Sequence, residues 1–170
     1  MKRWFTSALA VSPAVLTVLM CGFFIHNINV QDAARELTRT TTEAVLNAHA
    51  AVSAAQNIRE DRKGDYTDLS ASWFRGSAIG WDPIVPFSGP GYPNVGSFKK
   101  FGMHASHVPS VACVPFVLAA SAAFDDVYVG GTSSLDRGQS VFYDGNFLDF
   151  DKLDAACHAA AFVDIDLITH

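Results

Sequence analysis

The sequence predicts an α+β fold, in which one long N-terminal helix packs on an antiparallel β-sheet head. Two observations carry this prediction. First, no proline or glycine occurs between Gly22 and Gly64, so one helix can run unbroken through that region. Second, polar and apolar residues alternate, as in half-buried strands, in segments 125–131, 139–145 and 161–170. A long helix followed by strands is typical of the α+β class.

The N-terminal element is expected to be a membrane-spanning helix over residues 1–27. Residues 4–25 carry no charge, and such a run is long enough to cross about 30 Å of bilayer as a helix. The following residues, "HNINVQDAARE", offer no small-residue cleavage site, which disfavours the alternative of a cleaved signal peptide. Lys2 and Arg3 predict that the short N-terminal end stays cytoplasmic and that the rest of the chain is exported.

Residues 28–63 are expected to continue this helix as an amphipathic segment. An apolar stripe recurs every three or four residues and consists of Val30, Ala34, Leu37, Thr41, Val45, Ala48, Val52, Ala55 and Ile58. Five of these are predicted to pack the helix against the head: Val30, Leu37, Val45, Val52 and Ile58. Pro13 is expected to bend the helix, and Gly64 to end it after about 50 residues. A hinge between an anchor and a separate helix is the alternative.

Residues 64–170 are expected to form the globular α+β head. Segment 72–98 is rich in glycine, proline and aromatic residues, which indicates loops joining short strands. Segments 108–124 and 150–160 read as helices; the first begins either with Ser110 as N-cap or with Pro115 as its first residue.

Two cysteines of the predicted exported part, Cys113 and Cys157, are expected to form a disulfide, because thiols oxidise outside the cytoplasm. The bridge would close a loop of about 45 residues and contribute roughly 4 kcal/mol on the chain-entropy model. Two buried free thiols are the alternative. Cys21 lies in the apolar run, where a small apolar thiol needs no special explanation.

Composition and motifs exclude several classes of function. The 170-residue chain has a formal net charge of −5 and no basic patch, which argues against nucleic acid as its main ligand. His104 and His107 lack a third metal ligand at a suitable spacing and are interpreted as surface histidines in a loop. The acidic segment 144–154 lacks the ligand alternation and closing glutamate of a calcium loop. No serine has an assignable histidine and acid partner, so we expect no enzyme activity, cofactor or metal.

Four stretches together resemble type IV pilins. "GDYTDL" (64–69) is similar to the Gly-x-Tyr-x-x-Leu stretch at which pilins leave their N-terminal helix. The C-terminal half resembles the type IVb branch of conjugative and enteric pili in "VPSVACVPFV" (108–117), "FDDVYVGG" (124–131) and "LDAACHAAAFVDIDLITH" (153–170). The N-terminus diverges from the family pattern, because pilins carry a glutamate at the fifth mature position and the first glutamate here is Glu36.

The resemblance implies a structural subunit that polymerises through its N-terminal helix into an extracellular filament for adhesion, conjugation or aggregation. The implied partners are copies of the same chain, the inner membrane before assembly and the pilus assembly machinery. The implied filament-core residues are Phe5, Leu9, Pro13, Leu16, Leu19, Gly22 and Phe23. A low-copy, membrane-anchored minor pilin or pseudopilin-like component of a secretion system is the alternative.

Overall fold

The computed structural model describes residues 13–69, 81–90, 92, 95–131, 138–143 and 147–169; of residues 13–27 and 143 the backbone alone is described. The chain divides into two compact units, one up to Thr38 and one from Arg39 onward. The second unit therefore begins inside the long helix rather than at its end. We call this second unit the head and describe it by itself.

Helix α1 runs without interruption from Pro13 to Arg62, a length of 50 residues. It passes through Gly22, as the scarcity of helix breakers predicted. The helix ends where Lys63 and Gly64 adopt positive φ angles of 49° and 91°. A glycine in the left-handed region is the usual helix stop, because it has no Cβ to clash with the preceding carbonyl.

The membrane-spanning prediction falls mostly on residues whose side chains are not described. Residues 1–12 lie outside the described part of the chain, and residues 13–27 are described as helical backbone. Within the part of the chain that the structure describes, no helix has the length and hydropathy needed to cross a membrane.

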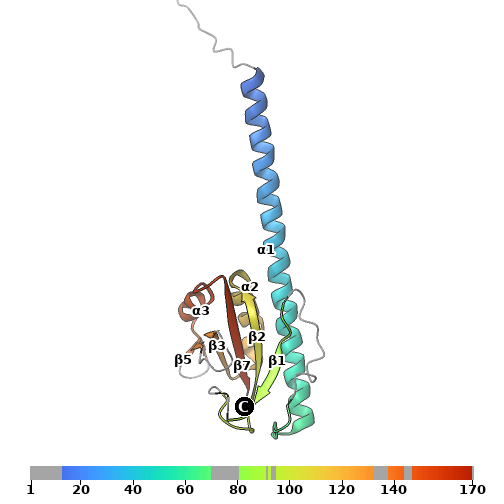
Figure 1. Cartoon of the computed structure of the whole chain (residues 1–170), viewed down its shortest axis with the longest axis vertical. Helices are drawn as coiled ribbons and strands as arrows, with labels where there is room; N and C mark the ends of the chain where they lie inside the picture. The colour runs from blue at the N-terminus through green and yellow to red at the C-terminus, as the bar shows by residue number, and fades with distance from the viewer. Residues whose placement is uncertain are drawn as a thin grey trace, which may run out of the picture. The chain divides into compact units, whose positions relative to one another are not determined.

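The head is built on a five-stranded sheet with the strand order β1-β2-β7-β3-β4, in which each pair of neighbours is antiparallel (Figure 1). Its strands are β1 (Val85–Ser88), β2 (Phe101–Pro109), β3 (Asp126–Gly131), β4 (Gln139–Ser140) and β7 (Phe162–Thr169). Strands β5 (Phe142–Tyr143) and β6 (Phe147–Leu148) form a separate two-stranded ribbon. The predicted strand over 139–145 is therefore split between two sheets.

The C-terminal strand β7 lies at the centre of the sheet, between β2 and β3. Its residues from 165 to 169 are all buried, so both faces of this strand are covered. One face carries Val163, Ile165 and Leu167. On this face Leu167 lies between its register partners Met103 of β2 and Val127 of β3. On the other face Phe87 packs with Ile168, and its ring lies over Gly102, where any Cβ would overlap it.

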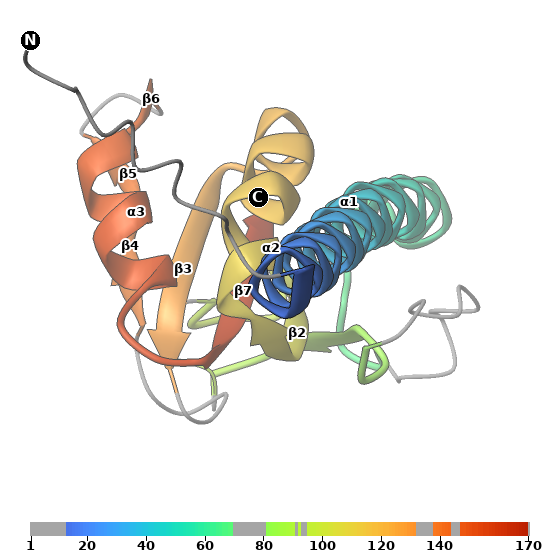
Figure 2. The same cartoon turned by 90° about the horizontal axis from the view of Figure 1, so that it is seen from above.

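Two short helices, α2 (Ser110–Ala120) and α3 (Phe150–Cys157), cover the first face of the sheet (Figure 2). A turn of 3-10 helix, η2 (Ser121–Ala123), follows α2. Helix α2 starts differently from either prediction, since Ser110 is already helical and Pro115 lies inside the helix. The Ser110 N–H donates to the carbonyl of Ala161 at 3.0 Å, so the neighbouring chain segment replaces the side-chain cap.

The C-terminal part of α1 contributes mostly alanines to the core of the head. Ala44, Ala48, Ala51, Ala55 and Ile58 are at most 1% exposed and belong to the same cluster as the sheet and α2 residues. Alanine projects only a methyl group, so the helix backbone can approach the neighbouring layer closely.

Candidate functional site

The predicted filament-core residues lie in the least described part of the chain. Phe5 and Leu9 fall outside the described residues, and Pro13, Leu16, Leu19, Gly22 and Phe23 are placed on α1 by their backbone alone. Their packing role therefore stays a prediction. The structure adds that five of the seven share one continuous helix with the head.

The stripe that packs α1 into the head differs from the predicted one. Ile58 is fully buried, whereas Val45 and Val52 are half-buried. Val30 and Leu37 are 53% and 54% exposed and precede Arg39, where the head begins, so their packing role stays a prediction. The buried positions of α1 within the head are mostly alanines with four-and-three spacing.

The predicted disulfide is present and joins α2 to α3. Cys113 and Cys157 are bonded with their Cα atoms 5.5 Å apart, and both are completely buried. The sequence separation of 44 residues encloses η2, β3, β4, β5 and β6. The alternative of two free thiols is thereby excluded, and the bridge fixes the two helices that cover the sheet.

Arg59 provides a second link, between α1 and the end of the sheet. Its guanidinium donates to the Thr169 hydroxyl and lies 3.6 Å from the Asp125 carboxylate. The Asp125 N–H in turn donates to the Ile168 carbonyl at 2.8 Å, which ties the entry of β3 to β7. Sequence reasoning missed this group because Arg59 and Thr169 are 110 residues apart and neither belongs to a recognisable motif.

The two histidines predicted to lie in a loop belong instead to strand β2. His104 faces Asp166 across the β2–β7 register, with its Nδ1 atom 2.6 Å from the carboxylate. His107 lies at a bulge with a φ of 53°, its N–H donates to Asp164 and its Nδ1 is 2.8 Å from Asp82. Among the described residues, no group of three histidine, cysteine or acidic side chains is arranged to hold a metal ion.

The hydrogen bond with Asp166 raises the pKa of His104 above its ordinary value of 6.5. Burial opposes this effect by disfavouring the charged imidazolium, while the negative charges of Asp166 and Asp164 act in the same direction as the hydrogen bond. Because Met103 and Ala105 point into the core, His104 lies on the opposite face of the sheet. The pair is therefore a polar cross-strand contact between two central strands.

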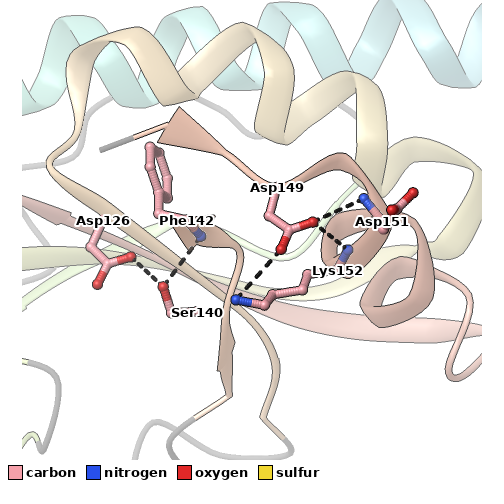
Figure 3. Close-up of polar contacts among 6 residues, drawn as sticks. All are labelled: Asp126, Ser140, Phe142, Asp149, Asp151 and Lys152. Atoms are coloured by element: carbon pink, nitrogen blue, oxygen red, sulfur yellow. Dashed lines mark hydrogen bonds and ion pairs between the residues drawn. The ribbon is translucent and has the colours of Figure 1, made fainter. Parts of the chain in front are cut away.

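In the acidic segment 144–154, residues 147–154 are described, and Asp149 among them stabilises the start of helix α3. Asp149 is buried and caps α3, accepting hydrogen bonds from the backbone N–H groups of Asp151 and Lys152 at 3.1 and 3.0 Å (Figure 3). The Lys152 ammonium lies 3.5 Å from the same carboxylate. These contacts are those of an N-cap, in which the carboxylate satisfies the first free N–H groups of a helix.

A second aspartate, Asp126 of strand β3, holds the segment that connects β4 to β5. Its carboxylate accepts a hydrogen bond from the Ser140 hydroxyl at 2.8 Å, and the Ser140 oxygen accepts one from the Phe142 N–H at 3.3 Å (Figure 3). The chain is thus turned from β4, at the edge of the main sheet, into the β5–β6 ribbon.

Comparison with known proteins gives a likeness in structure. The sequence matches no protein-family model and no curated protein sequence. Among solved structures, the crystal structure of TcpA, a type IV pilin from the Vibrio cholerae El Tor biotype, is similar with a TM-score of 0.53 at 14% sequence identity. The likeness covers 78% of this chain and 99% of that chain. The N-terminal helix, the antiparallel sheet and the Cys113–Cys157 bridge thus together form the type IV pilin fold.

Proposed function

We propose that this chain is a structural subunit of a type IV pilus of the IVb branch, which polymerises through its N-terminal helix into an extracellular filament. The observation that carries the proposal is the continuous helix α1 joined to a disulfide-linked head in the type IV pilin fold. The filament would serve in adhesion, conjugation or aggregation. The role needs no catalytic centre and no cofactor.

The physical basis of the proposal is a change of surroundings for the uncharged run over residues 4–25. Before assembly this run lies in the inner membrane, where lipid covers its apolar side chains. During assembly the same side chains become buried among the helices of neighbouring copies. The exchange of lipid for protein contacts leaves apolar surface out of water in both states, so the hydrophobic cost of leaving the membrane is small.

The head supports the same role through its stability outside the cell. A disulfide between two buried cysteines constrains the unfolded chain and persists in an oxidising environment. A subunit exposed to proteases and mechanical force benefits from both properties. The loop that the bridge closes, residues 113–157, contains η2 and strands β3 to β6 of the head.

The experiment that tests the proposal is electron microscopy of appendages sheared from the cell surface, with peptide identification by mass spectrometry. We expect filaments in which peptides of this chain are the dominant component. Detection of the chain only in inner membranes, with filaments built from other proteins, would overturn the proposal. A few copies per filament would support the alternative of a minor pilin or a pseudopilin-like component.

A further inference from the structure

Helix α2 is apolar on its buried side and on its outward side. Segment 101–124 contains no Asp, Glu, Lys or Arg. The buried side of the helix faces the core, while Val111 and Leu118 on the outward side are 52% and 44% exposed. A helix without a polar face is typical of one that is covered on all sides. We define the outward face of α2 by Val111, Pro115 and Leu118. We expect this face to be covered by an apolar surface of a partner.

A second exposed apolar stripe lies on α1, before the head begins. It consists of Val30, Ala34 and Leu37; Val30 and Leu37 are 53% and 54% exposed, and Ala34 is exposed as well. At 100° per residue these three positions share one side of the helix.

The charged residues near this stripe lie on the other side of α1 and pair with one another. Arg35 is 3.6 Å from Asp32, and Arg39 is 2.9 Å from Glu43. These pairs keep ionic groups away from the α1 stripe, which remains an apolar surface.

The two faces have the same spacing. In each, a valine is followed four residues later by a compact residue and three residues after that by a leucine: Val30, Ala34 and Leu37 on α1; Val111, Pro115 and Leu118 on α2. Four-and-three spacing is the seam along which helices pack side chains into the gaps of a neighbouring helix. Each face thus offers the other two projecting side chains and a shallow position between them.

We propose that the α1 stripe of one copy packs on the outward face of α2 of a second copy. This inference rests on the proposed function and names the contact that self-association would use. A contact between two different surfaces of the same chain is heterologous, and it repeats into an open filament when the rotation between successive copies does not close a ring. A charged partner such as an acidic peptide is disfavoured, because α2 has no ionic group to pair with the charge that would be buried.

The contact is tested by disulfide trapping between copies of the full chain in which Cys21→Ser removes the remaining cysteine outside the Cys113–Cys157 bridge. Two single variants, Leu37→Cys and Leu118→Cys, carry different tags and are expressed together in the producing cells. After mild oxidation we expect a mixed cross-linked dimer at least tenfold above the like-with-like dimer of either variant. The matched control combines Leu118→Cys with Gln56→Cys, an exposed position of α1 outside the stripe, and is expected to give only background.

The outcomes separate this contact from the proposed function. Filaments that contain the chain without a Leu37–Leu118 cross-link overturn the contact and leave the function standing. If the like-with-like dimer of Leu118→Cys forms in the same yield as the mixed dimer, α2 of one copy packs on α2 of another. This result also overturns the proposed contact between α1 and α2. The absence of any filament built from the chain overturns both. As a second variant, Leu118→Asp is expected to reduce filaments at least tenfold while the Cys113–Cys157 bridge still forms in the head.

Discussion

His104 and Asp166 show how a single polar pair is held inside a sheet. They face each other across β2 and β7, and their side chains are only 14% and 7% exposed. The carboxylate favours the protonated imidazole, which is why the pKa of His104 is raised. A group whose pKa is higher in the folded state binds its proton more tightly there than in the unfolded chain.

This linkage predicts a pH dependence of the head's stability. The contribution of His104 is fully present below its unfolded pKa of about 6.5 and is lost as the pH rises through the higher folded value. We expect the free energy of unfolding to fall as the pH rises from about 6 through the raised folded pKa of His104, and His104→Gln to lower it by about 2 kcal/mol at pH 6. Urea unfolding at several pH values measures this directly.

His107→Gln is the matched control for this prediction, because the His107 side chain is 73% exposed. The His107→Gln variant should show the same fall in the free energy of unfolding with rising pH as the unmodified chain. If His104→Gln unfolds with the same pH profile as the unmodified chain, the pair does not stabilise the head in the way described.

At the scale of elements, α1 packs into the head through alanines, and this makes the helix face sensitive to added volume. Ala48 is completely buried, so Ala48→Leu would force extra methylene groups into a filled space. We expect a loss of about 1–3 kcal/mol in the free energy of unfolding. Gln56→Leu adds the same side chain at an exposed position of α1 and should change stability by less than about 0.5 kcal/mol. Equal effects of the two variants would contradict the observed helix face.

The link between α2 and α3 gives the second prediction at this scale. Replacement of Cys113 and Cys157 by serine removes a bridge across 44 residues and should cost roughly 4 kcal/mol in the free energy of unfolding. Chemical denaturation under non-reducing conditions measures the difference, and Cys21→Ser serves as the control because Cys21 lies outside the head. An unchanged denaturation midpoint in the double variant would show that the bridge does not stabilise the head.

At the scale of the whole molecule, local patterns in the sequence predicted the long helix and the strands within 125–131 and 161–170, but they missed β2, and the bridge was inferred from the two cysteines of the predicted exported part. The stop at Gly64 and the alternation in 161–170 depend on near neighbours, so the sequence displays them. The central place of β7 could not be predicted, because it depends on pairing with β2 and β3 far along the chain. The same holds for His104 and Asp166, which are 62 residues apart.

The helix stripe shows a different limit of sequence reasoning. The predicted stripe contains Val45 and Val52, which are half-buried, whereas Ala44 and Ala51 lie outside that stripe and are completely buried. Strict alternation of four and three residues through Ala44, Ala48, Ala51 and Ala55 was the signal that would have located this face. Close approach of the helix, rather than hydrophobicity of single residues, decides which side is buried.

The central claim is that this chain is the repeating subunit of a filament with α1 at its core. Helical reconstruction by electron cryomicroscopy of the purified surface filament tests it most directly. The account predicts a map in which the head, from Arg39 onward, fits the outer layer and the N-terminal part of α1, from Pro13 to Phe23, packs against the same part of α1 in neighbouring copies. A map whose core cannot be traced with this helix, or whose side-chain density belongs to another protein, would contradict the account.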